Sequence, residues 1–325
     1  MPKKKREHKK FLIMGLGPIG GIFAAHMKKA GHTVCGIDVR KDFVEAVAEE
    51  GIMLEGMISL KAKLDQVCAH PDQLKEKNFD YVIIAVKTPY MEDVVAMIKG
   101  FNHNDGGFDV VSMQNGIDNE EFLAGHFGKK RSMRVVVNFA GNNVVPGLIK
   151  MTFFHKPNYV GCLCGYGKTC THENELAQLM TGAMLDTQVV EDVKKFAWRK
   201  SILVAALAPV SAIMGMTMAE VMNDGDTRSI VVKLLREAIE VARVHGFDYG
   251  EGFFAHCLDY LGTAGHHKPS MLVDIENGYP TEIDFLNGKI AYHGHMLNVD
   301  VLLHTSIASM IKAKERHLTA MKKAE

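Results

Sequence analysis

A single lysine, Lys200, opens a long apolar stretch of the chain, FAWRKSILVAALAPVSAIMGM, residues 196–216. The next charged residue after it is Glu220. Lys200, Val204 and Ala208 are four residues apart, so on a helix they share one face. Two interpretations fit this pattern. The aliphatic stem of the lysine can pack on apolar surface while its ammonium reaches water, or apolar surroundings can lower the pKa of a lysine and make it a proton donor near neutral pH.

A glycine-rich turn near the start of the chain points to a nucleotide. In FLIMGLGPIGGIFAAHMKKAGHTVCGID, residues 11–38, an apolar strand leads into a G-x-G-x-x-G pattern, and an amphipathic helix and a second strand follow. Glycines at these positions allow a tight turn, close approach of a pyrophosphate and close helix packing, and the helix N-terminus stabilises negative charge. The residues predicted to bind a dinucleotide are Gly15, Gly17, Pro18, Ile19 and Gly20.

The end of the second predicted strand bears on which dinucleotide binds. Asp38 lies about 20 residues beyond the glycine motif, where a carboxylate can hold both ribose hydroxyls. Because a carboxylate repels a 2′-phosphate, Asp38 favours NAD(H) over NADP(H). Arg40 and Lys41 follow closely and can accept that phosphate, so NADP(H) remains possible.

Strands and helices alternate through the rest of the first half. Strand patterns at 79–88, 108–118, 132–141 and 146–154 are interleaved with helical patterns at 90–100 and 119–127. This alternation predicts one doubly wound α/β sheet with ligands at the carboxyl ends of its strands. Lys87 and the Gln114–Asn115–Gly116 run fall at two such ends, and are therefore expected beside the cofactor.

The second half reads as helical. Residues 189–216 predict one long helix containing Pro209, and 227–246 and 299–324 predict two more. A chain of 325 residues is expected to form two domains. We therefore predict a basic flexible tail at 1–10, a dinucleotide-binding Rossmann domain at 11–188, and an all-α domain at 189–325.

Composition narrows the possible partners. Lys plus Arg and Asp plus Glu both number 38, and this balance argues against nucleic acid or an acidic membrane as the main partner. No signal peptide or transmembrane helix is recognised, because proline, serine and glycine interrupt the run at 201–218, which is interpreted as a buried core helix. Six scattered cysteines are expected to be reduced thiols in a cytoplasmic protein.

Two groups of possible metal ligands are set aside. The cluster CLCGYGKTCTH, residues 162–172, has the spacing C-x-C-x5-C-x-H, unlike the paired C-x2-C of structural zinc sites. Alternation around it favours a strand with Cys162 and Cys164 on one face. His293 and His295 diverge on a strand or a helix, and are expected to be surface histidines. No metal is predicted.

One polar segment of the second half is KPSMLVDIENGYPTEIDFLNG, residues 268–288. Ser270 and Asp274 lie one turn apart on a helix that starts near Pro269. Glu282 begins another helix, where its charge suits the helix N-terminus. Capping and solvation explain this pattern without any further role.

Taken together, these motifs resemble a known family. The order is GLGPIGG, a QNG turn, W-R-K at the start of a long helix, and P-S-M-L-x-D-I followed by T-E-I-D-F-L-N-G. This order is similar to the ketopantoate reductase family (2-dehydropantoate 2-reductases), from Phe11 to about Lys312. The resemblance implies a Rossmann domain followed by an all-helical domain, and hydride transfer from a reduced nicotinamide, usually NADPH, to a 2-oxo acid. It also implies a homodimer formed through the helical domain.

The resemblance implies a role for individual residues. Lys200 matches the catalytic lysine that hydrogen-bonds the ketone oxygen and protonates it as hydride arrives. Glu282 matches an acidic residue that supports the lysine and the substrate. Ser270 matches a serine that binds the substrate carboxylate, Asn115 an asparagine near cofactor and substrate, and Lys87 a lysine near the cofactor.

The chain departs from the family pattern at three positions. Family members usually carry asparagines four and eight residues after the lysine, to bind polar groups of the substrate, and this chain has Val204 and Ala208 there. Apolar residues cannot discriminate a hydroxyl by hydrogen bonding, so a more apolar 2-oxo acid is an alternative substrate. Asp38 also departs, because users of NADPH usually avoid a carboxylate there.

The leading functional hypothesis is a cytoplasmic, NAD(P)H-dependent 2-oxo acid reductase, with ketopantoate reduced to pantoate as the default reaction. One alternative is a family member that reduces a different, more apolar 2-oxo acid or an imine, as opine-forming enzymes do. The other is a catalytically idle nucleotide-binding protein.

Overall fold

The computed structural model describes residues 8–101, 107–164 and 171–324. The chain divides into two compact units. The sheet unit comprises Met1–Gln114 and Asn119–Val193, and the helical unit comprises Asn115–Asp118 and Lys194–Glu325. Most of the predicted basic tail lies outside the described residues, and Lys10 begins the first strand.

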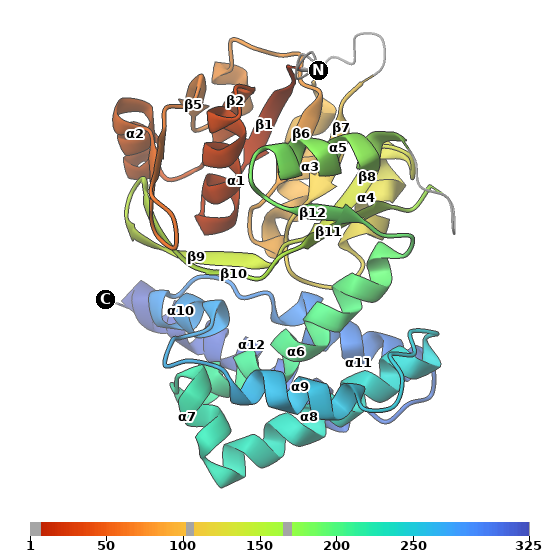
Figure 1. Ribbon diagram of the computed structural model, residues 1–325. Helices are drawn as coiled ribbons and strands as arrows, with labels where there is room; N and C mark the ends of the chain where they lie inside the picture. Colours follow the sequence, from red (N-terminus) through yellow and green to blue (C-terminus); the bar gives the residue numbers. More distant parts are fainter. Residues whose placement is uncertain (1–7, 102–106, 165–170, 325) are drawn as a thin grey trace. The chain divides into compact units, whose positions relative to one another are not determined.

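The sheet unit is built on one eight-stranded sheet, in the order β12-β11-β8-β7-β6-β1-β2-β5 (Figure 1). All neighbouring strands are parallel except β11 and β8. This confirms the predicted Rossmann-like α/β fold. The strands are β1 (Lys10–Met14), β2 (Thr33–Ile37), β5 (Gln66–Cys68), β6 (Tyr81–Ile84), β7 (Asp109–Ser112), β8 (Ser132–Val136), β11 (Asn158–Cys162) and β12 (Thr187–Val189).

Helices cover both faces of this sheet because its strands are apolar on both faces. In β1, Phe11 and Ile13 belong to one core cluster and Leu12 and Met14 to another. The first cluster includes side chains of α1 and α5, and the second includes side chains of α3 and α4. The helices of the sheet unit are α1 (Pro18–Lys29), α2 (Lys41–Glu50), α3 (Met91–Lys99), α4 (Asn119–Phe127) and α5 (Thr171–Gly182), with short 3-10 turns η1 (Pro71–Gln73) and η2 (Thr88–Tyr90).

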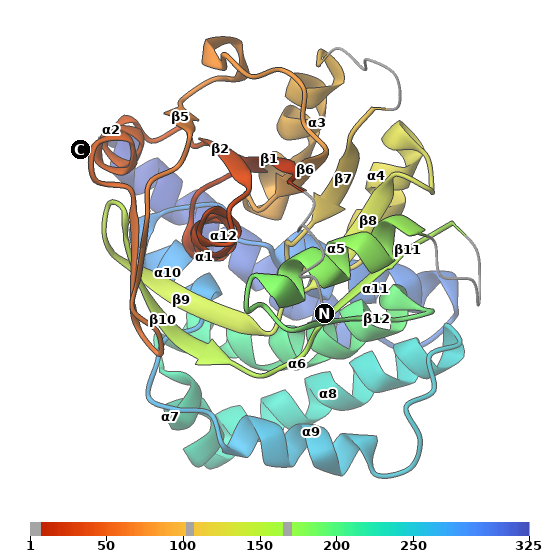
Figure 2. The ribbon, with the colours of Figure 1, turned by 45° about the horizontal axis from the view of Figure 1, so that its top comes forward.

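A second, four-stranded sheet was not expected from the sequence. Its order is β4-β3-β10-β9, and its strands are β3 (Ile52–Gly56), β4 (Leu60–Ala62), β9 (Phe139–Val145) and β10 (Leu148–Phe154). Of the predicted strands at 132–141 and 146–154, only the first part of the former, β8, joins the large sheet, so placing the second in the doubly wound sheet is wrong. Helix α1 contacts strands of both sheets and lies between them (Figure 2). The small sheet thus buries the face of α1 that the large sheet leaves uncovered.

The helical unit is all-α, as predicted. Its helices are α6 (Val193–Met214), α7 (Met218–Asn223), α8 (Gly225–Val244), α9 (Phe253–Gly262), α10 (Ser270–Asn277), α11 (Asn287–Met296) and α12 (Leu302–Ala324), with a 3-10 turn η3 (Ile283–Phe285). Helix α6 starts at Val193, because the preceding residues Thr187–Val189 form β12. Pro209 lies inside α6, at the predicted place.

Helix α6 is long and apolar enough to cross a membrane by length and composition alone. However, 67% of its most apolar window is buried inside the protein. Trp198, Ile202 and Ala205 of this helix belong to the core cluster of the helical unit. This burial is typical of a core helix, which passes the same test of length and composition.

Two expectations about individual side chains need correction. Cys162 and Cys164 are joined by a disulfide, so the prediction of reduced thiols is wrong for this pair. Cys162 ends β11 and Cys164 lies in the bend that follows it, and their Cα atoms are 5.5 Å apart, within the range that a disulfide spans. His293 is not a surface histidine: its side chain is 15% exposed. Cys170 lies outside the described residues.

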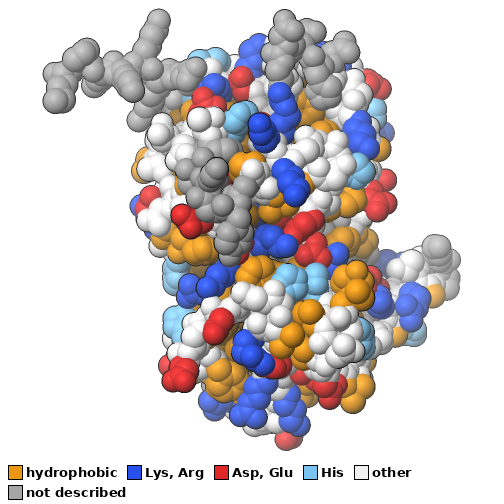
Figure 3. Space-filling model, turned by 90° about the vertical axis from the view of Figure 1, so that its right-hand side faces the viewer, with side chains coloured by type: hydrophobic (Ala, Val, Ile, Leu, Met, Phe, Trp, Pro, Cys, Tyr) orange, Lys and Arg blue, Asp and Glu red, His pale blue; other side chains and the backbone are white. Residues whose placement is uncertain are grey.

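Charge is mixed on the molecular surface. Figure 3 shows Lys and Arg side chains interspersed with Asp and Glu side chains on one face. The formal net charge of the chain is +0. We therefore expect no strong long-range field of one sign.

A buried polar pair lies in the core of the helical unit. Asn287 and His304 are both 0% exposed, and Asn287 Nδ2 lies 3.0 Å from His304 Nδ1. Asn287 also donates to the carbonyl of Ala205 (2.9 Å), and His304 Nε2 lies 3.0 Å from the carbonyl oxygen of Leu234. Burial lowers the pKa of His304 to about 4, and its hydrogen bond to Leu234 only partly opposes this. The folded protein therefore keeps this imidazole neutral.

We expect the helical unit to lose stability as the pH falls from 6.5 toward 4. His304 has an ordinary pKa of 6.5, so the unfolded chain takes up a proton in this range while the folded chain does not. At one pKa unit per about 1.4 kcal/mol, the full loss is on the order of 3 kcal/mol. Unfolding by urea, measured at several pH values, should show a smaller loss in His304→Gln than in the wild type. The exposed His256→Gln serves as the control and should keep the wild-type dependence; equal pH dependence in all three proteins would contradict this role.

Candidate active site

The glycine turn between β1 and α1 has the geometry of an anion-binding turn. Gly15 has φ +91°, and a Cβ there would lie 2.8 Å from the backbone nitrogen of Val86. A Cβ on Gly20 would lie 2.0 Å from the carbonyl oxygen of Gly15, so only glycine lets α1 start this close to β1. A Cβ on Gly17 would meet nothing within 4 Å. The backbone of Gly17 therefore borders open space at the helix N-terminus.

The start of α1 is suited to a negative ligand. Pro18 is its first residue, Ile19 is half-buried, and its first turn contains no acidic side chain. The unpaired N–H groups and the helix dipole favour an anion at this end. These residues fit the pyrophosphate of a dinucleotide, as the sequence predicted, and the open space beside Gly17 is what such a group requires.

Asp38 follows β2 and is tied to the glycine turn. Its carboxylate is 8% exposed and accepts a hydrogen bond from the backbone N–H of Leu16 (3.0 Å). Arg40 binds the same carboxylate through Nε (2.9 Å), Nη2 (3.1 Å) and its backbone N–H (3.1 Å). The guanidinium of Arg40 also lies 4.3 Å from the centre of the Phe43 ring. The charge of Asp38 is thus balanced within the protein.

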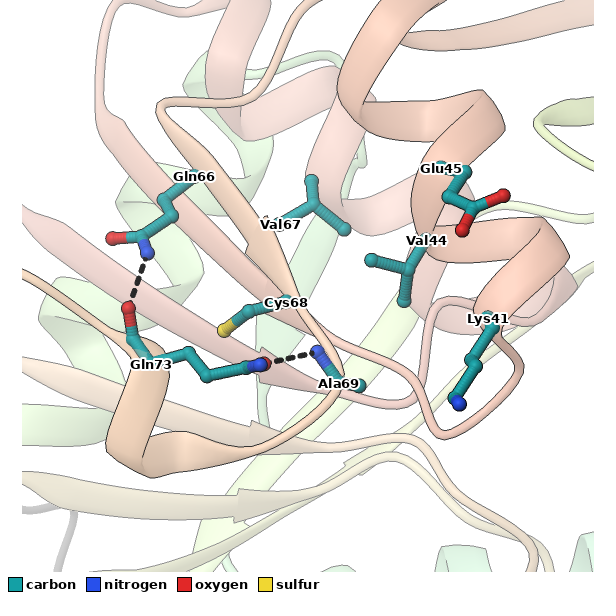
Figure 4. Close-up of a pocket in the computed structure, with 8 residues that line it drawn as sticks. All are labelled: Lys41, Val44, Glu45, Gln66, Val67, Cys68, Ala69 and Gln73. Carbon is teal, nitrogen blue, oxygen red and sulfur yellow. Dashed lines mark hydrogen bonds between the residues drawn. The ribbon is translucent and has the colours of Figure 1, made fainter.

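A pocket of about 420 Å³ lies next to Asp38 in the sheet unit. Its lining residues come from α2 and from β5 and the segment after it: Lys41, Val44, Glu45, Gln66, Val67, Cys68, Ala69 and Gln73 (Figure 4). The backbone N–H of Asp38 donates to the carbonyl of Cys68 (3.2 Å), which joins the pocket to the end of β2. Apart from Lys41, none of the residues predicted to bind the cofactor lines this pocket.

Two polar residues lie at the carboxyl ends of the next strands. Lys87 is half-buried and precedes η2, just after β6. Gln114 follows β7, and its Nε2 donates to the carbonyl of Val86 (3.0 Å). Arg134, which holds Gln114 in place, was not predicted from the sequence. Arg134 of β8, which is 2% exposed, donates from Nη2 to the carbonyl of Gln114 (2.5 Å). An arginine in an otherwise apolar strand was the available signal.

The helical unit brings together two of its predicted site residues. Asn115 Nδ2 lies 3.5 Å from Glu282 Oε2. Glu282 is 8% exposed and is the N-cap residue of η3, so the helix that it was predicted to begin is a short 3-10 helix. Helix α11 begins five residues later, at Asn287. A buried carboxylate beside an amide donor is an arrangement that can orient a polar ligand.

Three further predicted residues lie along α6. Lys200 and Val204 are half-buried, and Ala208 is 4% exposed. Helical spacing of four residues places them in one row on α6, with the lysine at one end and apolar side chains beyond it. Ser270 is exposed and is the first residue of α10.

The sequence analysis also missed Asp118, which follows the QNG turn. Its carboxylate binds Lys289 Nζ (2.9 Å) and His293 Nε2 (2.8 Å) of α11. Its backbone has a left-handed φ of 66°. The sequence showed only an aspartate two residues after Gly116, in a segment expected to line the cofactor. Nothing in that pattern indicated which residues Asp118 binds.

Both parts of the chain match models of one protein family. Residues 11–165 match Ketopantoate reductase PanE/ApbA, and residues 192–315 match Ketopantoate reductase PanE/ApbA C terminal. The chain belongs to the ketopantoate reductase family. This membership confirms the resemblance seen in the sequence, and with it the order of a Rossmann-like domain followed by a helical one. As a member of the ketopantoate reductase family, the protein is an NAD(P)-dependent oxidoreductase that acts on a CH–OH group and interconverts 2-oxo and 2-hydroxy acids.

Individual relatives agree with this assignment. The 2-dehydropantoate 2-reductase of Pyrococcus abyssi is 28% identical over 306 residues, which cover 94% of this chain and 98% of the relative. That of Aquifex aeolicus is 29% identical over 316 residues, covering 94% and 97%. Among solved structures, D-mandelate dehydrogenase with NADH and anilino(oxo)acetate has a TM-score of 0.84 at 23% identity, covering 95% of this chain and 99% of that one. The structural likeness concerns the fold.

The open space beside Gly17 leads to a prediction about cofactor binding. We expect Gly17→Ala to leave the melting temperature unchanged, because the added Cβ meets no atom of the protein. It should weaken NADH binding by about tenfold or more, or about 1.4 kcal/mol, because the methyl group occupies the space left for the pyrophosphate. Titration of cofactor fluorescence measures the affinity.

Two other glycines serve as references for this test. Gly20→Ala should lower both stability and cofactor affinity, since its Cβ overlaps the carbonyl of Gly15. Gly125→Ala in α4 adds a methyl group in open space away from the turn, so it should keep cofactor affinity and should not lower stability, because alanine favours a helix over glycine. Wild-type affinity in Gly17→Ala would place the pyrophosphate elsewhere.

Proposed function

We propose that the protein reduces a 2-oxo acid to the 2-hydroxy acid with NADH or NADPH, and that ketopantoate is the default substrate. The observation that carries this proposal is the match of both parts of the chain to ketopantoate reductase models. The bound reduced nicotinamide supplies the hydride. The residues of the chain bind and orient the substrate and supply the proton.

Lys200 is the proposed proton donor. Reduction of a ketone develops negative charge on its oxygen, which a positioned ammonium stabilises and then neutralises. Support comes from the half-buried position of Lys200 on α6 and from its place in the W-R-K motif of the family. Glu282 is proposed to support this lysine and the substrate, Asn115 to contact the substrate, and Ser270 to bind its carboxylate. The partly buried Asn115–Glu282 contact supports a shared role for that pair.

The row along α6 bears on the choice of substrate. Val204 and Ala208 stand where family members usually have asparagines, and neither can hydrogen-bond the hydroxyl group of ketopantoate. We therefore propose that 2-oxo acids with an apolar side chain are reduced at least as well as ketopantoate. D-mandelate dehydrogenase, which shares the fold, binds anilino(oxo)acetate, an oxo acid that bears an aromatic ring. In that protein, the fold accommodates an apolar group beside the 2-oxo acid.

The decisive experiment follows cofactor oxidation by absorbance, with ketopantoate and a panel of apolar 2-oxo acids. We expect turnover by the wild type, and we expect Lys200→Ala to lower kcat by about 10²- to 10⁴-fold, the usual contribution of a general acid. Binding of NADH should be unchanged in this variant, because the cofactor residues are elsewhere in the sequence.

The matched control is Lys195→Met on the same helix, which removes a charge and should keep activity. Lack of turnover by the wild type with every oxo acid would contradict the proposed function. Wild-type activity in Lys200→Ala would show that the protein catalyses the reaction without Lys200 as its proton donor. Turnover only with an amine added to the keto acid would indicate the imine-reducing alternative.

The contacts of Asp38 and Arg40 bear on the choice between NADH and NADPH. Asp38 is proposed to hold the adenosine ribose and to disfavour a 2′-phosphate. Arg40 is bound to Asp38, and its side chain is 39% exposed. It is therefore available to a 2′-phosphate, as guanidinium groups commonly are. We propose that the protein uses both cofactors and favours NADH.

We expect substitutions at these two residues to shift the preference in opposite directions. Arg40→Ala should reduce kcat/KM for NADPH more than for NADH, because the phosphate loses its cation. Asp38→Asn should move the preference toward NADPH, since the negative charge is lost while an acceptor for the Leu16 N–H remains. Steady-state kinetics with each cofactor measure the ratio. An equal effect on both cofactors in both variants would show that this pair only shapes the turn.

The homodimeric state, the cytoplasmic location and the lack of nucleic-acid or membrane partners stay predictions. They rest on the family resemblance, on the balanced charge and on the composition. Sedimentation of the purified protein measures the first directly.

A further inference from the structure

A short piece of the chain between two elements of the sheet unit belongs to the helical unit. Residues Asn115–Asp118 connect β7 with α4, yet they group with α6 to α12. The residue before them, Gln114, is held within the sheet unit by the carbonyl of Val86 and by Arg134. The four residues after Gln114 make their own contacts in the helical unit. We call them the 115–118 segment.

Three contacts hold the 115–118 segment. At its start, Asn115 Nδ2 lies 3.5 Å from Glu282 Oε2. In its middle, the backbone N–H of Ile117 donates to the carbonyl of Phe285 (2.9 Å), and the Ile117 side chain is buried in the core of the helical unit. At its end, Asp118 binds α11. The first two contacts both involve η3 or its capping residue.

The contact at Asp118 is the strongest of the three. Its carboxylate, 16% exposed, accepts from Lys289 Nζ at 2.9 Å and from His293 Nε2 at 2.8 Å. Burial by itself would raise the pKa of Asp118, but the hydrogen bonds and charges of His293 and Lys289 outweigh it and lower the pKa to about 2. Asp118 is therefore ionised at every pH at which an enzyme of this kind is assayed. Charge-assisted bonds of this geometry are roughly twice as strong as neutral ones.

The partners of Asp118 are themselves held by their surroundings. The His293 ring lies 5.2 Å from the ring of Trp198 and 4.9 Å from that of His245. Burial, followed by the charges of His293 and Lys194, lowers the pKa of His245, so His245 is neutral near pH 7. Lys289 and His293 are four residues apart on α11 and face the same carboxylate. The clamp of Asp118, Lys289 and His293 is therefore fixed to the packed core around Trp198.

We propose that Asp118 is a positioning residue of the active site: clamped by Lys289 and His293, it holds the 115–118 segment so that Asn115 stays beside Glu282. This role rests on the proposed function of Asn115 and Glu282 at the substrate. Asp118 acts through Asn115 and does not touch the reacting atoms. Loss of the clamp removes the anchor at the end of the segment, so the Asn115 amide is held less firmly beside Glu282.

The test uses a substitution that the backbone tolerates. Asp118 has φ +66°, a left-handed conformation that Asn adopts about as readily as Asp. Asp118→Asn therefore removes the charge without adding backbone strain. His293→Gln removes one of the two groups on α11 that bind Asp118. This second variant tests the proposal even if Asp118→Asn folds poorly. Glu240→Gln, which breaks the exposed ion pair with Arg243 on α8, is the matched control.

We expect Asp118→Asn and His293→Gln to lower kcat/KM for the 2-oxo acid by about 10- to 100-fold, the cost of a catalytic group displaced by about 1 Å. The KM for NADH should stay near the wild-type value. In an Asn115→Ala background, Asp118→Asn should have little further effect, because residues that act through one another are not additive. A merely structural role for Asp118 would instead add its effect in both backgrounds.

The fluorescence emission of the single tryptophan reports on the clamp without any measurement of turnover. Trp198 is the only tryptophan of the chain and its ring contacts that of His293. Its emission should change in Asp118→Asn and in His293→Gln, and should match the wild type in Glu240→Gln. This reading shows that the clamp has been released in the folded protein.

The outcomes separate this role from the proposed function. Changed emission together with wild-type kcat/KM in both clamp variants would overturn the role of Asp118 and leave the reaction intact. Additive losses in the Asn115→Ala background would overturn it as well. A wild type that reduces no 2-oxo acid would overturn the proposed function, and this role with it.

Discussion

The hydrogen bond from the Leu16 N–H to the Asp38 carboxylate couples the two parts of the cofactor site. The glycine turn must be tight because α1 starts against β1, where Gly20 leaves no room for a side chain. The buried carboxylate must be partnered, and it takes the Leu16 N–H and the guanidinium of Arg40. One side chain thereby shapes the pyrophosphate turn and lies where the ribose is expected. If Asp38 holds the ribose as proposed, cofactor choice and the shape of the turn depend on the same side chain.

In the helical unit, several buried polar side chains are hydrogen-bonded to one another or to the backbone. Asn287 and His304 bind each other and backbone carbonyls inside the core. Glu282 lies at the turn between α10 and α11, where its carboxylate meets Asn115. The apolar packing around Trp198 and α6 gives these polar residues a rigid support. A general acid benefits from such a support, because positioning accounts for much of the rate enhancement of an enzyme.

In the proposed site, the apolar row on α6 affects which oxo acid is bound, while the chemistry of reduction depends on Lys200. In the proposed mechanism, Lys200 donates the proton that every 2-oxo acid reduction requires, and the residues one and two turns later contact the variable part of the substrate. With Val204 and Ala208 there, a hydroxyl group on the substrate would be buried without a hydrogen bond. That penalty is absent for an apolar group. The same fold can thus serve different oxo acids by changes at two helix positions, as expected when function lies in sites rather than in folds.

The sequence by itself determined the elements that depend on local periodicity. The glycine turn, the parallel strands around β1 and the long apolar helix with Lys200 were predicted because each has a pattern that repeats within about twenty residues. The candidate site residues Asn115, Glu282 and Ser270 came from the resemblance to the ketopantoate reductase family, which the QNG turn and the segment at 268–288 carry. The fit to the ketopantoate reductase family extends over nearly the whole chain for the same reason.

Only the tertiary structure decided what depends on contacts between distant residues. The second sheet joins β3 and β4 with β9 and β10, which are more than 75 residues further on, and no local pattern records that pairing. The clamp of Asp118 by Lys289 and His293 spans more than 170 residues, and the isolated pattern H-G-H indicated surface histidines instead. The contact of Asn115 with Glu282 is equally remote. Periodicity shows which face of an element is buried, but the partner across that face is set by how the whole chain packs.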